Sequence, residues 1–228
     1  MNVLVIAPHP DDEAIGCGGT ICRHADTGDR VEVAFLTSGE LGLKRLAREQ
    51  AWAVREAEAR AAAQVLGVAS THFLRQSDWL LNDSVDAAAA ALAHVIDGCR
   101  PERIYLPHPA DGHPDHRASI DIIRAGLRAC AGGKGACELW AYEIWSPLPE
   151  CDRAQDVTAC MARKLAAVRC YRSQLEQYRY DHAIRGLNRY RGALGLRRRY
   201  AEAFLTVTTA VGAGVEPALT AVAPGGIV

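Results

Sequence analysis

One repeated pattern restricts the fold of this chain more than any other feature. Short apolar runs rich in β-branched residues alternate with longer segments of helical period. The apolar runs are Val3–Ala7, Val31–Thr37, Thr71–Leu74, Arg103–Pro107, Leu139–Ile144 and Phe204–Thr208, and the helical segments are Glu13–Ala25, Arg48–Leu66, Val85–Ile96 and His116–Cys130. Each of the first four runs is followed by enough residues for a crossover helix, as parallel strands require. We therefore predict an α/β fold with a mainly parallel sheet and helices on both of its faces.

The rest of the chain gives weaker signals. Gln155–Gln174 indicates a further amphipathic helix, and Arg185–Tyr200 is rich in Arg and Gly. The last stretch, Val211–Val228, holds one charge and several Gly and Pro, which predicts a packed-down coil or a loosely packed tail. Because 228 residues contain no internal repeat and no Ser/Gly linker, we expect residues 1–228 to form one domain.

Composition excludes several classes of partner. The 26 Lys and Arg residues nearly balance the 27 Asp and Glu residues, so we expect no bulk attraction to nucleic acid or to an anionic membrane. Every apolar stretch is far shorter than the roughly 20 residues that span a bilayer. The opening Met1–Ile6 has no basic leader and is soon followed by Asp11–Glu13, which predicts a cytoplasmic protein without a cleaved signal. None of the eight cysteines forms a C-x-x-C pair, so we expect reduced interior thiols.

Two polar loops follow predicted strand ends, and both carry histidines and carboxylates. The first is Ala7–Glu13 and the second is Pro107–His116. Ligands bind at the carboxyl ends of the strands in such sheets. An imidazole and carboxylates on one turn, joined by an imidazole from a distant parallel strand, suit a catalytic zinc with three protein ligands and a position for water. The prolines in both loops restrict the backbone and pre-order these side chains.

The acidic residues of the first loop also have a purely structural interpretation. Acidic residues in the first turn of a helix are favoured by the helix dipole, so Asp11, Asp12 and Glu13 alone do not require a metal. The preceding His9 and the later His-x-x-His pair, His113 and His116, favour the metal. Amide hydrolysis needs a base beside the metal, and one of two adjacent carboxylates can serve if the other is a ligand. Spacing alone decides neither which aspartate nor which histidine of the second loop binds.

These motifs resemble the LmbE/PIG-L family of zinc-dependent N-acetylglucosaminyl deacetylases. The resemblance covers about residues 2–130. It rests on Pro8–Glu13, on Thr37–Glu40, on Val54–Glu58 leading to Leu66–Val68, and on His113–His116. It implies a Rossmann-like three-layer fold, and it implies removal of the N-acetyl group from an N-acetylglucosamine-type sugar conjugate by attack of a metal-bound water. The conjugate would be a thiol-cofactor or antibiotic intermediate.

The resemblance also implies a role for individual residues. Zinc would be held by His9, Asp12 and His116, Asp11 would be the general base, and His113 would steady the oxyanion or protonate the leaving amine. Arg55 and Asp78 would contact sugar hydroxyls, and Arg191 is the candidate for an anionic part of the substrate. A tyrosine that assists the oxyanion in the mycothiol-pathway branch is replaced here by Asp111. The stretches Tyr171–Gln174 and Asn188–Gly192 are more similar to the bacillithiol-type and antibiotic-pathway deacetylases.

The sequence also allows other functions and other roles for several residues. A metal- and sugar-binding module without turnover would need only the ligands, whereas here both acid–base positions are occupied. His108 is a candidate for orienting a metal ligand. The glycines Gly16, Gly18 and Gly19 follow an acidic cluster that would repel a pyrophosphate, so we expect them to allow close packing of a helix on the sheet. The arginine-rich segment indicates a solvated or subunit-contacting face, which leaves a homo-oligomer open.

Overall fold

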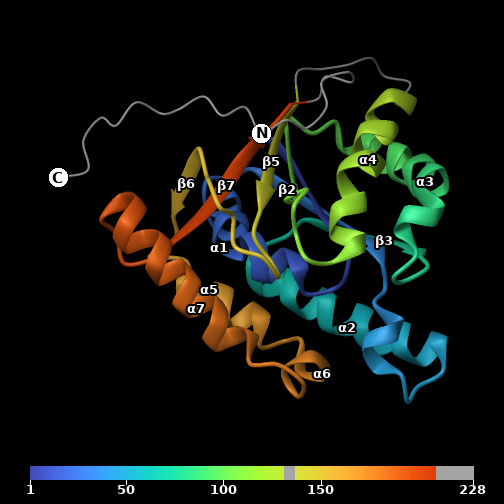
Figure 1. The fold of residues 1–228 in the computed structure, drawn as a ribbon, viewed down its shortest axis with the longest axis horizontal. Helices are drawn as coiled ribbons and strands as arrows, with labels where there is room; N and C mark the ends of the chain where they lie inside the picture. The colour runs from blue at the N-terminus through green and yellow to red at the C-terminus, as the bar shows by residue number, and fades with distance from the viewer. Residues whose placement is uncertain (131–136, 209–228) are drawn as a thin grey trace.

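The computed structural model describes residues 1–130 and 137–208, and these residues form a seven-stranded sheet with the order β3-β2-β1-β4-β5-β7-β6 (Figure 1). The strands are β1 (Asn2–Ala7), β2 (Arg30–Thr37), β3 (Ser70–Gln76), β4 (Arg103–Pro107), β5 (Glu138–Tyr142), β6 (Arg153–Asp156) and β7 (Ala201–Val207). The first five are parallel to one another, and β7 pairs antiparallel with both β5 and β6. The predicted Rossmann-like, mainly parallel α/β fold is confirmed.

Helices cover both faces of this sheet, as the pattern predicted. They are α1 (Asp12–Asp26), α2 (Arg48–Leu66), α3 (Val85–Cys99), α4 (Pro114–Ala129), α5 (Met161–Val168), α6 (Arg172–Leu175) and α7 (Tyr180–Arg191), with the single-turn elements η1 (Glu40–Leu43), η2 (Leu81–Ser84) and η3 (Gly192–Leu196). Helices α3 and α4 pack on one face, and α1, α2, α5 and α7 lie on the other (Figure 1). Within the described ranges, every helix is too short or too polar to cross a lipid bilayer. The predicted tail, Val211–Val228, lies outside the described residues.

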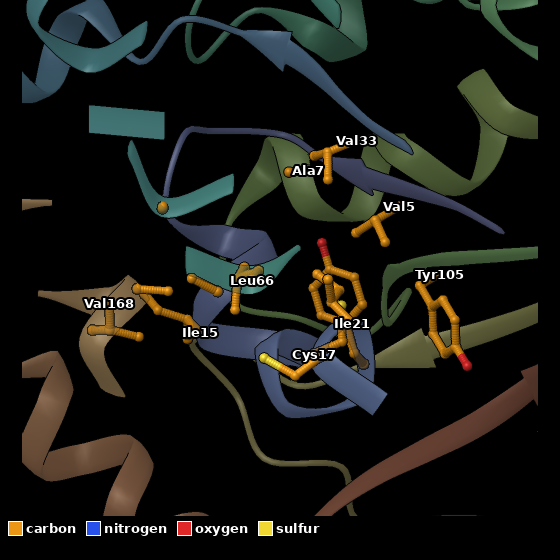
Figure 2. Close-up of a cluster of buried hydrophobic side chains, with 14 of the residues drawn as sticks. Val5, Ala7, Ile15, Cys17, Ile21, Val33, Leu66, Tyr105 and Val168 are labelled. Atoms are coloured by element: carbon orange, nitrogen blue, oxygen red, sulfur yellow. The ribbon is translucent and has the colours of Figure 1, made fainter. Parts of the chain in front are cut away.

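Strand β1 shows why its run is apolar throughout. Val3, Val5 and Ala7 pack into the core on the α1 side, and Leu4 and Ile6 pack into the core on the α3 side. Successive side chains of a strand point to opposite faces, so a strand covered on both sides needs apolar residues at every position. Figure 2 shows the first of these cores, in which side chains of α1 meet those of β1 and β2.

The glycines of α1 allow this helix to approach the sheet closely. A Cβ atom on Gly16 would lie 2.1 Å from the ring of Tyr142 in β5, and one on Gly19 would lie 2.6 Å from Val157. Both distances are far below van der Waals contact, so larger side chains would push the helix outward. The expectation that these glycines serve packing is confirmed at both positions.

The prediction of one helix over Gln155–Gln174 is wrong at both ends, because α5 ends at Val168 and the short helix α6 begins separately at Arg172. Gln155 and Asp156 belong to β6, and helix α5 begins only at Met161. Strand β6 lies at the edge of the sheet, and its residues are exposed or half-buried. Polar residues are typical of edge strands, so this strand carries no apolar alternation that would reveal it in the sequence.

All eight cysteine thiols are free. Cys17, Cys22, Cys99 and Cys160 are buried, and Cys130, Cys137 and Cys170 are half-buried. Cys151 is exposed, so the expectation of an interior position is wrong for this thiol.

A buried ion pair joins three elements near the end of the sheet. Lys164 of α5 donates to Glu202 of β7 at 2.6 Å, and both side chains are fully buried. Glu202 also accepts hydrogen bonds from the backbone N–H groups of Gly19 and Thr20 in α1, each at 2.8 Å. The carboxylate therefore connects α1, α5 and β7 on the face of the sheet that α1 covers.

Replacing one partner of this pair should be strongly destabilising. We expect Lys164→Met to lower the free energy of unfolding by about 3–5 kcal/mol, because it leaves a buried carboxylate without its cation. Urea unfolding followed by circular dichroism measures the change. The matched control is Asp26→Asn, which removes the exposed Arg163–Asp26 pair and should cost less than about 1 kcal/mol. Equal stability of Lys164→Met and the unmodified protein would show that the pair is dispensable.

Candidate metal centre

The two polar loops meet at one point because their strands are neighbours. Strands β1 and β4 pair in parallel, so the loops that follow them leave the same edge of the sheet. His9 follows β1, Asp12 begins α1, and His116 lies in the first turn of α4. Asp12 Oδ2 is 3.2 Å from His9 Nδ1 and 3.2 Å from His116 Nε2, and the two ring nitrogens are 3.4 Å apart. We call these three atoms the donor triangle.

The donor triangle has the dimensions of a zinc site. Zinc–nitrogen and zinc–oxygen bonds of 2.0–2.2 Å at tetrahedral angles place neighbouring ligand atoms about 3.3–3.5 Å apart. The donor triangle, with sides of 3.2 to 3.4 Å, is close to this spacing. Two imidazoles and one carboxylate are also a ligand set that zinc accepts in catalytic sites. The residues present therefore fit the ion that the sequence predicts.

Each histidine of the donor triangle is oriented by a carboxylate at its other ring nitrogen. His116 Nδ1 lies 2.9 Å from Asp111 Oδ1, and His9 Nε2 lies 3.1 Å from oxygens of both Asp78 and Asp115. Such partners hold a metal-binding imidazole in one orientation and raise its basicity. Sequence reasoning did not assign this role to Asp111 or Asp115. The signal was present, since both residues lie within five positions of His116 in the second loop.

His108 lies one contact further from the donor triangle. Its Nε2 is 2.8 Å from the backbone oxygen of Ser146 and 3.6 Å from Asp111 Oδ2. It therefore supports Asp111, which in turn supports His116, rather than touching a predicted ligand. His113 and the two histidines of the donor triangle have ring nitrogens within 4.8 Å of one another, so His113 lies beside the predicted ion.

Asp11 stands apart from the donor triangle. Its carboxylate is 3.6 Å from the guanidinium of Arg55, and its side chain caps no backbone N–H of α1. Its φ of 126° is a backbone conformation that residues other than glycine rarely adopt. Such backbone strain is typical of functional sites. The buried carboxyl of Glu13 accepts from the Asp11 backbone N–H at 3.2 Å and is itself bonded by the Tyr171 hydroxyl. This neighbour holds the strained turn in place.

Burial and charge shift the pKa values of the cluster in different directions. Burial lowers the pKa of His116, but Asp12 and Asp111 outweigh it and raise the pKa to about 9. In the same way, hydrogen bonds to Asp115, Asp12 and Asp78 overcome burial and hold the pKa of His9 well above its usual value. Burial also opposes ionisation of Asp12, yet the two imidazoles keep its pKa far below the usual range.

The pKa values of Asp11 and His113, which lie outside the donor triangle, are shifted so that the uncharged form of each is favoured. Burial raises the pKa of Asp11 to about 7, although Arg55 opposes the shift. Burial, together with the neighbouring His9 and His116, lowers the pKa of His113 to about 4. Near neutral pH, His113 is therefore an uncharged imidazole.

Metal affinity should fall as the pH falls. Because the pKa values of His9 and His116 are raised, both rings are imidazolium cations near pH 7, with a proton on each ring nitrogen. A metal must therefore displace one proton from each ring. Each released proton changes the affinity about tenfold per pH unit, so we expect zinc affinity to fall by about two to four orders of magnitude from pH 8 to pH 6. Calorimetric titration in two buffers of different ionisation enthalpy counts the protons. An affinity that does not change over this range would contradict the assignment of both ligands.

A cleft of about 230 Å³ opens over these residues. The residues at its base include His9, Asp11, Asp12, Arg55 and Asp78. Its remaining lining comes from loops and helices and consists of Ile15, Gly39, Leu41, Gly42, Lys44, Trp79, His113, Ile144, Trp145, Gln174, Gln177, Tyr178 and Tyr180. The predicted base Asp11, the predicted ligands His9 and Asp12, and the predicted sugar contacts Arg55 and Asp78 therefore line one cleft, and His116 is buried beneath it.

Arg55 has unused hydrogen-bonding capacity inside this cleft. Its side chain is buried, and one terminal nitrogen donates to the backbone oxygen of Pro10 at 2.6 Å. Its Nε and Nη1 atoms have no hydrogen-bond partner among the described residues. Gly39 adopts a φ of 62° beside it, and a Cβ there would lie 2.9 Å from the guanidinium. Unsatisfied buried donors are costly, which indicates that a ligand oxygen completes this site.

Asp78 and Arg191, the other two predicted substrate contacts, lie in different surroundings. Asp78 lines the cleft, where it approaches His9 and accepts from the backbone N–H of Leu41 at 2.9 Å. The guanidinium of Arg191 pairs with Glu143 and donates to the backbone oxygen of Leu148. Arg191 is not among the residues that line the cleft.

Comparison with known sequences supports one family. The profile described as PIG-L, GlcNAc-PI de-N-acetylase, matches residues 4–126. A probable N-acetyl-alpha-D-glucosaminyl L-malate deacetylase 2 from Bacillus cereus is 31% identical over 185 residues, which cover 77% of this chain and 84% of that protein. The chain spans only about half the length of the 1D-myo-inositol 2-acetamido-2-deoxy-alpha-D-glucopyranoside deacetylases that it also matches, 54% and 52% in two of them.

Solved structures share the fold over almost the whole chain. An N,N'-diacetylchitobiose deacetylase from Pyrococcus horikoshii has a TM-score of 0.78 and 27% identity, with 91% of this chain and 84% of that chain covered. GalB, a 4-carboxy-2-hydroxymuconate hydratase from Pseudomonas putida, has a TM-score of 0.72 and 26% identity, with 94% and 100% covered. Because one of these proteins is a hydratase, the fold alone does not determine the reaction, and the residues of the cleft have to do so.

Proposed function

Since this chain belongs to the PIG-L family of GlcNAc-PI de-N-acetylases, we propose that it is a zinc-dependent hydrolase that removes the N-acetyl group from an N-acetylglucosamine-type sugar conjugate. The observation that carries the proposal is the donor triangle of His9, Asp12 and His116, because His9 and Asp12 line the same cleft as Asp11 and His113. A metal site, a free carboxylate and a neutral imidazole are the groups that amide hydrolysis needs.

His9, Asp12 and His116 would hold the ion. A zinc ion bound there would supply a Lewis acid and lower the pKa of water at the site toward 7. Asp11 is the carboxylate left free to accept a proton, and Arg55 and the Glu13 carboxyl hold it in position. The sequence predicted that one of the two adjacent aspartates binds the metal and the other acts as the base. Asp12 contacts both imidazoles and Asp11 contacts Arg55, which supports Asp12 as the ligand and Asp11 as the base.

We propose that His113 donates a hydrogen bond to the developing oxyanion. Its Nδ1 accepts from the backbone N–H of Asp115 at 3.2 Å. The neutral ring therefore carries its proton on Nε2, which is a donor in the cleft. A donor held in place before the reaction stabilises charge as it forms, without reorganisation. A neutral imidazole would become an imidazolate if it gave up this proton, so the proton that Asp11 has accepted from water is the one that can pass to the departing amine.

Arg55 and Asp78 are the proposed contacts of the sugar. The free Nε and Nη1 donors of Arg55 suit neighbouring hydroxyl oxygens, and Asp78 can accept from a hydroxyl. Small-molecule aminosugar conjugates fit this arrangement, as the names of the relatives suggest.

A binding module without turnover is the rival proposal. It would keep the donor triangle and Arg55, but nothing in binding alone requires the strained backbone of Asp11. The occupied base position therefore supports turnover.

An amine-release assay tests the proposal directly. The zinc-loaded protein would be incubated with malate and inositol glucosides of N-acetylglucosamine, and with acetylated aminoglycoside and glycopeptide intermediates. We expect at least one conjugate to release equal amounts of free amine and acetate. A conjugate that binds at the cleft while every conjugate stays acetylated would favour the binding module.

A further inference from the structure

The outer part of the cleft is lined by aromatic rings. Trp79, Trp145, Tyr178 and Tyr180 all line it, and the first three are 56%, 48% and 53% exposed. The ring centroids of Trp145, Tyr178 and Tyr180 lie 5.6–5.7 Å from one another, so these three side chains form one cluster. We call the four residues the aromatic rim. Exposed apolar side chains grouped around a cleft are typical of a ligand-binding surface.

Trp79 connects the aromatic rim to the donor triangle. Its ring contacts His113 edge to face with a centroid distance of 4.4 Å. Its φ of 67° is an unusual conformation for a bulky residue, and its backbone N–H donates to buried Asp115 Oδ2 at 2.8 Å. Asp115 also lies 3.1 Å from His9 Nε2, so the carboxylate that orients a predicted metal ligand also holds this strained turn. Strain kept at such a place indicates that the exposed ring has a function.

We propose that the aromatic rim is a subsite for a flat aromatic aglycone of the sugar conjugate. The inference rests on the proposed function, because the acetamido group must reach Asp11 and His113 at the base of the cleft. The sugar would then lie beside Arg55, and its anomeric substituent would extend to the rim. Stacking on aromatic rings stabilises a flat apolar group in this position.

The rim offers mainly the faces of aromatic rings, and its polar groups lie at the tips of those rings or are partly engaged. The amide of Gln177 donates to the backbone oxygen of Gly42 at 2.9 Å, and that of Gln174 donates to Ser173 at 3.1 Å. Lys44 is the one charged residue among the cleft lining beyond the base. A second sugar or an inositol would need hydrogen-bond partners for each of its hydroxyls, whereas a flat aromatic ring gains its contacts from the ring faces alone.

Binding of two matched glycosides tests this subsite. The full zinc-loaded chain with Asp11→Asn, which should not turn over, would be titrated calorimetrically with phenyl and methyl N-acetylglucosaminides of the same anomeric form. We expect the phenyl glycoside to bind at least about tenfold more tightly, from stacking on two or more rings. In the same background, Trp145→Ala and Tyr178→Ala should each reduce this ratio, and the double variant should reduce it further, leaving only the contribution of Trp79 and Tyr180. Trp145→Phe, which keeps a ring, should preserve most of it.

The control is Tyr190→Ala, because Tyr190 is 57% exposed and is not among the cleft-lining residues. It should leave the phenyl-to-methyl ratio unchanged. A ratio near one in the parent, or tighter binding of a chitobiose or malate conjugate than of the phenyl glycoside, would overturn the aromatic subsite. If the unmodified enzyme still deacetylates the methyl glycoside in that case, the proposed function stands and only the subsite fails. Neither binding nor turnover of any conjugate would overturn both.

Discussion

We expect the Asp11→Asn variant to keep its zinc and to lose deacetylation by two or more orders of magnitude. The amide is nearly the same size as the carboxylate, and Asp11 contributes no atom to the donor triangle, so the ligands stay in place. The amide cannot accept the proton that the reaction releases, and loss of a general base costs about 10²–10⁴ in rate. Elemental analysis measures the zinc, and amine release measures kcat/KM with the same conjugate.

The matched control for this variant is Asp121→Asn, because the Asp121 side chain is 69% exposed and lies on the surface of α4. It should retain both zinc and turnover. Undiminished turnover of Asp11→Asn would remove Asp11 from the reaction. Loss of zinc together with turnover would show instead that Asp11 belongs to the metal site.

His9→Ala and His116→Ala release the metal. Each substitution deletes one of three protein donors, and two donors at this spacing bind zinc far more weakly than three. We expect each variant to hold less than about one-tenth of the stoichiometric zinc after dialysis, with turnover lost in proportion. His182→Ala is the control, because the His182 side chain is 69% exposed. Full zinc occupancy in both ligand variants would contradict the donor triangle.

The sequence predicted the part of the fold that depends on apolar periodicity. The strands buried on both faces are apolar at almost every position, and α2 begins at Arg48 and ends at Leu66 as predicted. The convergence of the two polar loops followed from the parallel pairing of β1 with β4. Strand β6 was missed because an edge strand with solvent on its open side does not need apolar residues.

The motifs of the site could be predicted from the sequence, but the carboxylates that orient its histidines could not. Spacing brings His9 and His116 together, but it does not tell which ring nitrogen meets a carboxylate, and so Asp111 and Asp115 remained without a role. Arg191 stays a predicted substrate contact, and its pairing with Glu143 was not predicted because Glu143 lies in a loop that no periodic pattern describes. The aromatic rim was missed for the same reason, since Trp79, Trp145 and Tyr178 lie in three separate loops and Tyr180 begins α7.

The proposed hydrolysis requires that His9, Asp12 and His116 bind a single zinc ion. The most direct test is an anomalous difference map recorded at the zinc absorption edge from crystals of the zinc-loaded protein. We predict one strong peak within about 2.0–2.2 Å of His9 Nδ1, Asp12 Oδ2 and His116 Nε2. A map in which the zinc lies at cysteine sulfurs, or in which His9 and His116 bind no common ion, would contradict the claim.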